Sequence, residues 1–228
     1  MTPMLSFENV NVAIADAPVL RNVSFALAPG VSAALIGRNG AGKTTTVRTI
    51  MGFTKASGHV RLGGQDLGSV APHRRPALGL GYAPEDRRLF SAFTVEENIL
   101  LPGRVAKLNP DEMTRRLERA YSVLPELKEL AKRPAGSVSG GQGKMVALGR
   151  ALMLGTKLLI LDEPFQGLAP VLAQRYAEAL RRLRSQDKDI TLLITESNLK
   201  LLETFADVTL TIERGEIEAG KPAGGTSH

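Results

Sequence analysis

The sequence predicts an α/β fold in which an alternating strand–helix chain carries a helical insert. Strand and helix patterns alternate in the first and last thirds of the chain, which is typical of a parallel sheet covered by helices. The short apolar run at 31–36 is typical of a buried strand. Residues from about 85 to 150 are mostly helical in pattern. The 228 residues allow one to two domains with a substantial core.

Strand patterns dominate the first 84 residues. Apolar residues recur at short spacing in the expected strands, which are Leu5–Ile14, 19–27, 31–36, 59–62 and Leu80–Ala83. A helix is expected over Lys43–Met51, after a glycine-rich connection. His59 and His73 are interpreted as surface residues.

The middle of the chain begins two helices with recognisable caps. Thr94 and Glu97 have the spacing of a capping box. Asn109 is a capping residue followed by a proline at the first helical position and by acids in the first turn. Two prolines, Pro125 and Pro134, interrupt the helical pattern that continues to about residue 154.

The alternation resumes after residue 150. The expected elements are a strand at 157–161, a helix near 172–183, a strand at 190–194, a helix at 199–205 and a strand at 208–212. The helix near 172–183 has one apolar stripe: Leu172, Tyr176, Ala179, Leu180 and Leu183. We therefore predict one domain with a core at 1–84 and 151–218, a helical subdomain at 85–150 and a flexible tail at 219–228.

Composition narrows the function classes. The net charge is +6, and the basic pairs are short and typical of solvated faces: Arg74-Arg75, Arg87-Arg88, Arg115-Arg116 and Arg181-Arg182. Aromatic residues make up 4% of the chain, which argues against base-stacking platforms. The chain has no cysteine, no apolar run near the roughly 20 residues of a membrane helix, and no secretory signal in its first ten residues. We expect a soluble protein of the cytoplasm.

Residues 37–44 fit the P-loop pattern. They follow an expected buried strand and open an expected helix, which is the context that this motif requires. Glycines let successive backbone amides face phosphate oxygens, and the helix N-terminus adds its positive end. Lys43 is expected at the β- and γ-phosphates, and the Thr44 hydroxyl at Mg²⁺. The residues predicted to bind ATP here are Gly37, Arg38, Asn39, Gly40, Ala41, Gly42, Lys43, Thr44 and Thr45. The alternative is a glycine-rich turn without a ligand.

Two carboxylates follow another apolar strand. Asp162 and Glu163 end the run at 158–161, and a parallel strand would deliver them to the sheet edge where ligands bind. Asp162 is then a partner of Mg²⁺, and Glu163 orients or deprotonates the attacking water. The alternative is a pair of acids in a turn.

A third motif begins a helix. Ser139 and Gln142 have capping-box spacing, so free amides and a hydroxyl are expected at this helix start. Such a start can bind an anion, although it can also be a helix cap and nothing more.

These three motifs in this order resemble an ATP-binding cassette (ABC) ATPase. The resemblance covers about residues 5–218. Residues 139–153 and 165–170 are similar to the ATPase subunits of importers for branched-chain amino acids and their amide and urea relatives. Residues 84–90, leading into 94–98, point the same way.

The resemblance implies a fold and a mechanism. The fold is a P-loop NTPase with a RecA-like core, an antiparallel β subdomain and an inserted α-helical subdomain. Two ATPases pair head to tail, as a homodimer or a heterodimer, and each covers the other's nucleotide with the trans-phosphate signature Ser139, Gly140, Gly141 and Gln142. Closure on ATP is relayed to transmembrane permease subunits, whose coupling helices contact the groove near residues 85–90.

Three positions differ from the pattern common in the family. Ile14 stands where many cassettes stack an aromatic residue on adenine, and Glu85 stands where most have a glutamine near Mg²⁺. Ser197 stands where many have a histidine that touches the γ-phosphate. Because serine is a short donor without a cationic form, we expect slow hydrolysis or dependence on the partner. The alternatives are a plain strand residue at Ile14, a solvent-facing acid at Glu85 and a helix cap at Ser197.

The sequence thus predicts an ATPase subunit of an importer for branched-chain amino acids or related small polar solutes. We expect ATP and Mg²⁺ as cofactors, Glu163, Lys43 and Ser197 as catalytic residues, and Thr44, Asp162 and Glu85 as metal partners. We expect a peripheral location at the cytoplasmic face of the inner membrane and no nucleic-acid partner. One alternative is an ATP-dependent dimerising module with weak or no hydrolysis. Another is a soluble cassette ATPase acting on nucleic acid or ribosomes, which the absence of coiled-coil inserts disfavours.

Overall fold

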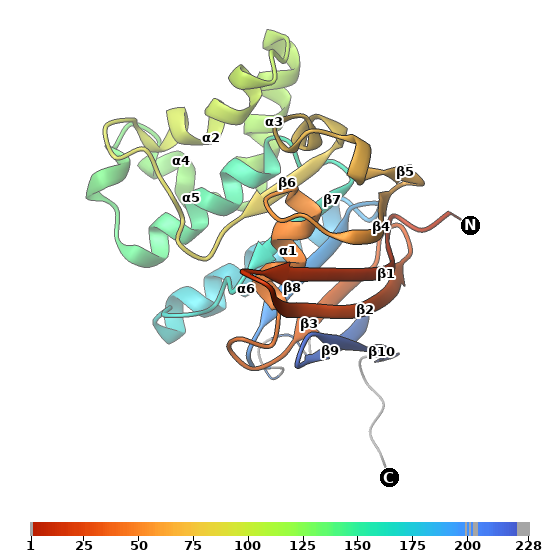
Figure 1. The fold of residues 1–228 in the computed structure, drawn as a ribbon. Coiled ribbons are helices and arrows are strands. Elements are labelled where there is room, and N and C mark those ends of the chain that lie inside the picture. The colour runs from red at the N-terminus through yellow and green to blue at the C-terminus, as the bar shows by residue number, and fades with distance from the viewer. Residues whose placement is uncertain (1, 199, 201, 203–204, 223–228) are drawn as a thin grey trace. The chain divides into compact units, whose positions relative to one another are not determined.

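The computed structural model describes residues 2–198, 200, 202 and 205–222. The chain divides into two compact units, one of residues 1–78 with 189–228 and the other of residues 79–188. These boundaries differ from the subdomains expected from the sequence, since the second unit takes in both the helical insert and the strands on either side of it. Each unit is described in turn (Figure 1).

The first unit contains an antiparallel sheet with the strand order β2-β1-β4-β5. Its strands are β1 (Leu5–Ile14), β2 (Ala17–Leu27), β4 (Ser57–Leu62) and β5 (Gln65–Asp66). Leu5 is paired with Leu27 on one side and Leu62 on the other, and all three are buried. Phe7 and Phe25 stack across β1 and β2, with ring centroids 4.7 Å apart. This sheet confirms the antiparallel part of the expected fold.

The same unit also contains parallel strands. β3 (Ser32–Ile36) pairs in parallel with β8 (Thr191–Glu196) and with β9 (Val208–Glu213). β10 (Glu216–Pro222) is antiparallel to β9. Every residue of β8 is buried, as expected for a strand covered on both faces. Helix α1 (Lys43–Met51) follows β3, so the loop between them lies at the carboxyl end of a central strand.

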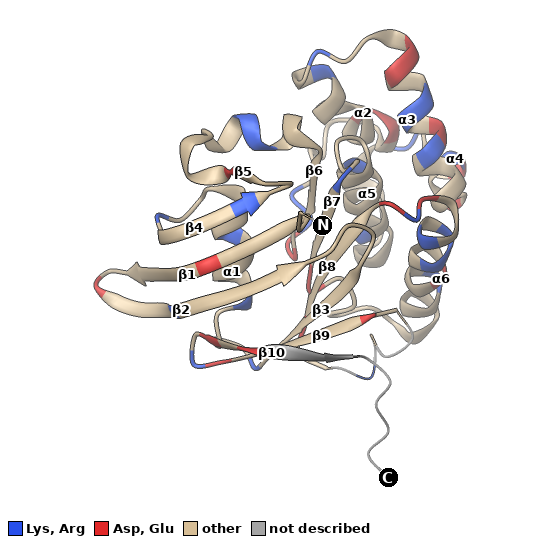
Figure 2. Ribbon diagram, turned by 90° about the vertical axis from the view of Figure 1, so that its right-hand side faces the viewer, with Lys and Arg blue, Asp and Glu red and all other residues tan. Residues whose placement is uncertain are grey.

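The second unit is mainly helical around two parallel strands, β6 (Leu80–Ala83) and β7 (Leu158–Asp162). Its helices are α2 (Val95–Val105), α3 (Pro110–Val123), α4 (Glu126–Leu130), α5 (Gly140–Leu152) and α6 (Pro170–Gln186). Helix α5 contacts α2, α3 and β6 and buries nine of its residues. Figure 2 shows basic and acidic residues interspersed along α3.

The helix caps agree with the sequence. Thr94 and Glu97 form both bonds of a capping box at the start of α2, and Ser139 and Gln142 do so at the start of α5. Asn109 accepts a hydrogen bond from the Glu112 amide at the start of α3. These predictions are confirmed because a capping box is a local device that needs no tertiary partner.

Other expectations differ from the structure. β10 extends to Pro222, so residues 219–222 of the expected tail form part of a strand. Leu172 is only partly buried in the α6 stripe, whose other four members are buried. The helix expected at 199–205 and the tail beyond 222 lie largely or wholly outside the described residues.

Arg75 corrects the expectation that the basic pairs lie on solvated faces. It is 7% exposed, and its guanidinium donates to four backbone carbonyls: those of Thr49, Ile50, Leu67 and Val70. Burial lowers the pKa of Arg75. Thr49 and Ile50 lie in the last turn of α1, where a cation complements the helix dipole. Arg75 therefore caps the helix that follows the P-loop.

Among the described residues, no helix is long and apolar enough to cross a membrane.

Candidate nucleotide site

The P-loop connects β3 to α1 in the first unit. Gly42 is the N-cap residue of α1 with φ 118°, and Gly40 has φ 82°. Both values lie in a region that side-chain-bearing residues rarely adopt. A Cβ on Gly37 would lie 2.5 Å from the Ile212 carbonyl oxygen, so this position has no room for a side chain. The loop therefore folds tightly at the carboxyl end of β3, as the motif predicts.

Lys43 lies inside this loop with 5% of its surface exposed. Its Nζ donates to the Gly37 carbonyl at 2.6 Å, the Arg38 carbonyl at 3.3 Å and the Ser197 hydroxyl at 3.1 Å. The Ser197 hydroxyl in turn donates to Oδ1 of Asn39 at 3.0 Å. The structure thus brings together five predicted site residues, although Ser197 is 154 positions away from Lys43.

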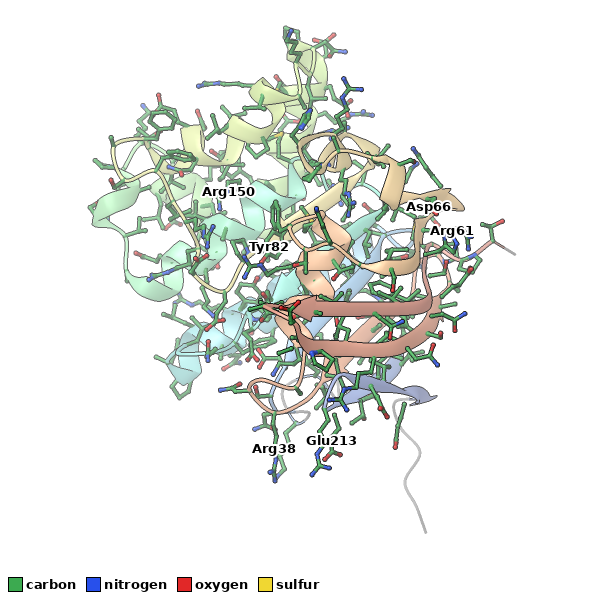
Figure 3. The ribbon with its side chains drawn as sticks, in the orientation of Figure 1. Arg38, Arg61, Asp66, Tyr82, Arg150 and Glu213 are labelled. Atoms are coloured by element: carbon green, nitrogen blue, oxygen red, sulfur yellow. The ribbon has the colours of Figure 1, made fainter. Side chains whose placement is uncertain are left out.

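A pocket of about 490 Å³ adjoins the P-loop within the first unit. It is lined by residues 37–41 and 211–214. Arg38 and Glu213 project at the same end of the unit (Figure 3). Ile14 is not part of this lining; it ends β1 opposite Ala17 and is 48% exposed. An exposed aliphatic surface of this kind can bury a base but cannot stack on it.

Two hydroxyls of the first turn of α1 face different surroundings. The Thr44 side chain is exposed, and Thr45 is partly buried. A hydroxyl at this place can ligate a hard cation. No group of three or more His, Cys, Asp or Glu side chains in the described part of the chain could hold a metal ion.

Asp162 and Glu163 lie at the carboxyl end of β7 in the second unit, 2% and 5% exposed. The Tyr82 hydroxyl, from the parallel strand β6, donates to Oδ2 of Asp162 at 3.4 Å. Burial, reinforced by the Asp162 charge, raises the pKa of Tyr82. The phenol therefore stays protonated and can orient the carboxylate. Sequence reasoning did not find Tyr82, although the alternation along 80–83 places it on one face of β6.

Glu163 has φ 47°, which is a left-handed conformation. A residue with a side chain pays about 1–2 kcal/mol for such a conformation, so it persists only where the surroundings fix it. Its carbonyl oxygen accepts from Nζ of Lys144 at 2.6 Å and from the Gln166 amide at 3.2 Å. Local strain beside a buried carboxylate is typical of a functional position.

The signature motif opens α5 in the same unit. The Ser139 hydroxyl accepts from the Gln142 amide at 3.2 Å, and Oε1 of Gln142 accepts from the Ser139 amide at 3.0 Å. Ser139 and Gly140 are exposed, whereas Gly141 is buried. A helix leaves its first amides without intrahelical partners, so this exposed start can bind an anion.

The segment after β6 is held against α5. Arg87 and Arg88 have φ 60° and 45°, and the guanidinium of Arg150 donates to their carbonyls at 2.6 and 2.7 Å. Arg87 donates to the Gly140 carbonyl at 3.1 Å. Glu85, which precedes them, is exposed. The role of Arg150, which is labelled in Figure 3, was not predicted. Its partners are backbone carbonyls, so no acidic side chain in the sequence points to them.

The comparisons with known proteins agree with these motifs. The family described as ABC transporter matches residues 20–166. The chain belongs to the ABC transporter family. BraG of Pseudomonas aeruginosa, named as a high-affinity branched-chain amino acid transport ATP-binding protein, is 36% identical to this ABC ATPase over 94% of the chain and 91% of the relative. A probable branched-chain amino acid transport ATP-binding protein LivF of Archaeoglobus fulgidus is 32% identical over 94% and 90%.

Solved structures give the same assignment for the ABC ATPase. An ATP-binding cassette of an ABC transporter in its ADP conformation has a TM-score of 0.82 and 30% identity, covering 97% of this chain and 92% of that one. An ATP-binding subunit of an ABC transporter has a TM-score of 0.84 and 28% identity, with coverage of 96% and 90%. The expected fold class, a P-loop NTPase, is thereby confirmed.

Proposed function

We propose that this ABC ATPase binds MgATP and hydrolyses it to energise a membrane importer for branched-chain amino acids or related small polar solutes. The observation that carries the catalytic part is the buried, strained Glu163 next to Asp162. The solute class rests on the relatives, two of which are named for branched-chain amino acid transport. A peripheral position at the cytoplasmic face of the inner membrane, in contact with permease subunits near residues 85–90, belongs to the same proposal.

The P-loop holds the triphosphate in this mechanism. The γ-phosphate takes the place of the Gly37 and Arg38 carbonyls around Nζ of Lys43, because a phosphate is the stronger acceptor of a charged hydrogen bond. Backbone amides of the P-loop and of the first turn of α1 would bond the remaining oxygens. Ile14 contacts the base through aliphatic surface alone.

Thr44, Asp162 and Glu85 are the residues that would hold Mg²⁺. Mg²⁺ supplies charge neutralisation across the β- and γ-phosphates. Tyr82 fixes the Asp162 carboxylate through its hydrogen bond, which keeps an oxygen directed at the sheet edge. Thr44 presents an exposed hydroxyl at the first turn of α1.

Glu163 acts as the general base. Its carboxylate accepts a proton from the attacking water while the bond between the γ-phosphorus and its bridging oxygen breaks. The Ser197 hydroxyl accepts a hydrogen bond from Lys43 and donates one to Asn39. The same hydroxyl can donate to the γ-phosphate instead. It carries no positive charge, so we propose that hydrolysis at this site is slow. A second ABC ATPase, identical or different, covers the nucleotide with its copy of the signature at Ser139, Gly140, Gly141 and Gln142.

ATP turnover by the purified chain tests the catalytic proposal. Glu163→Gln should lower kcat by at least about 100-fold, since a general base contributes that much or more. Binding of a fluorescent ATP analogue should stay within about threefold, because the carboxylate is not needed to bind the phosphates. Equal turnover by the two proteins would favour the alternative, a dimerising module without hydrolysis.

Uptake tests the solute. Cells that lack this chain should lose uptake of radiolabelled leucine and regain it with the wild-type chain but not with Glu163→Gln. Unchanged leucine uptake, together with intact ATP turnover, would place the chain in an importer for another solute class.

A further inference from the structure

Lys144 connects the signature helix to the backbone of Glu163. It lies in the second turn of α5, and its Nζ donates to the Glu163 carbonyl oxygen at 2.6 Å. The Gln166 amide donates to the same oxygen at 3.2 Å. The carbonyl thus accepts one charged and one neutral hydrogen bond, and the charged bond is the stronger of the two.

The carbonyl direction matters because Glu163 is in the left-handed region, with φ 47°. This region is unfavourable for a residue with a side chain, so contacts with surrounding residues must hold Glu163 in the conformation. The peptide of Glu163 is fixed on one side by its place at the end of β7 and on the other by Lys144. Together they set the direction in which the Glu163 side chain leaves the backbone.

A second contact joins the same two segments. A Cβ on Gly141 would lie 2.3 Å from Cδ1 of Leu172 and 3.2 Å from Cδ2 of Leu168. The first turn of α5 therefore packs without a gap against the residues that follow Glu163. With the Lys144 bond, α5 contacts residues 163–172 at two points.

We propose that Lys144 is a positioning residue that holds the general base from the signature helix. The inference rests on the proposed function of Glu163 and of the signature. The signature contacts the nucleotide of the opposite subunit, whereas Glu163 serves the nucleotide of its own chain. Lys144 therefore links the two ATP sites through its hydrogen bond to Glu163 within one subunit.

Three variants of the full-length chain test the link. Lys144→Met removes the charged donor with little change of volume, and Lys144→Arg keeps it. Lys128→Met, at an exposed position of α4 in the same unit, is the control for removal of a positive charge. Lys144→Gln, a neutral donor, is the second variant should Lys144→Met fail to fold. Two measurements are made: amide hydrogen exchange at residues 165–168 without nucleotide, and kcat and KM for ATP.

The expected result for Lys144→Met is amide exchange at residues 165–168 accelerated by about tenfold, with kcat lowered by about tenfold and KM within twofold. Such a split follows from a misplaced base in a site that still binds ATP. Lys144→Arg should recover most of both losses, and Lys128→Met should match the wild type.

Wild-type exchange in Lys144→Met would overturn the inference, and so would a kcat loss matched by a proportional rise in KM. A wild-type chain without any ATP turnover would instead contradict the proposed function. The exchange data would then decide on Lys144 by themselves, because they need no nucleotide.

Discussion

The two compact units hold their functional residues in different ways. In the first unit, Lys43 is bonded to carbonyls five and six positions away, within one continuous loop. In the second, Asp162 and Glu163 are held by side chains 80 and 19 positions away, those of Tyr82 and Lys144. The contacts of Lys43 with the P-loop carbonyls are therefore local in the sequence, whereas its bond to Ser197 and the placement of the carboxylates depend on tertiary structure.

Arg75 also lies in the first unit, but it bonds carbonyls that are distant from it in the sequence. Arg75→Ala removes four hydrogen bonds to carbonyls and leaves those carbonyls buried, so we expect a loss of about 3 kcal/mol in the free energy of unfolding. Arg74→Ala, an exposed neighbour, is the control and should change stability by less than about 0.5 kcal/mol. Urea denaturation measures both. Equal midpoints would mean that α1 does not need this cap.

Substitution of Gly37 tests whether the P-loop depends on space. The Cβ introduced by Gly37→Ala would lie 2.5 Å from the Ile212 carbonyl oxygen. The loop must therefore shift, and ATP affinity should fall by about 100-fold. At Gly40 nothing lies within 4 Å, and Gly40→Ala meets only the cost of its positive φ, about 1 kcal/mol. Equilibrium binding of a fluorescent ATP analogue distinguishes them. Equal losses would show that conformation, not space, limits this loop.

Arg150 provides the matching test in the second unit. Arg150→Met frees the carbonyls of Arg87 and Arg88, so residues 85–90 should exchange their amides faster, and the free energy of unfolding should fall by about 2 kcal/mol. Arg133→Met, at an exposed position, serves as the control. Unchanged exchange would mean that this segment keeps its left-handed residues without help from α5.

Ser197 is expected to give the smallest effect. Ser197→His restores a side chain that can be cationic, and we expect turnover to rise by about threefold with no change in unfolding. Ser197→Ala should reduce turnover by only about twofold, because Lys43 would still bond the phosphate oxygens without the Ser197 hydroxyl. Steady-state kinetics give both values. A histidine variant without any gain would tell against slow hydrolysis caused by Ser197.

The same contrast explains what the sequence could predict. The bounds of β1, β6 and α1 and both capping boxes are confirmed, since periodicity and caps are local. Residues 219–222 were expected in the flexible tail because Gly220 and Pro222 disfavour strands, yet they extend β10, which pairs with β9 across the turn at Arg214. The burial of Arg75 was missed for a related reason, as its partners are carbonyls that any sequence supplies.

The contacts of the candidate site also divide into those that are local in the sequence and those that join distant segments. The P-loop contacts of Lys43 follow from a motif, and so does the exposed start of α5. The bond between Ser197 and Lys43 joins distant segments, as do the hydrogen bonds made by Tyr82 and Lys144 in the other unit. Their partners become neighbours only after the sheet has formed, so no spacing in the sequence marks them.

A crystal structure with Mg²⁺ and a non-hydrolysable ATP analogue tests the central claim most directly. We predict that Nζ of Lys43 leaves the carbonyls of Gly37 and Arg38 and bonds phosphate oxygens, while the Thr44 hydroxyl approaches the metal. An analogue bound elsewhere, with Lys43 still on its two carbonyls, would contradict the account.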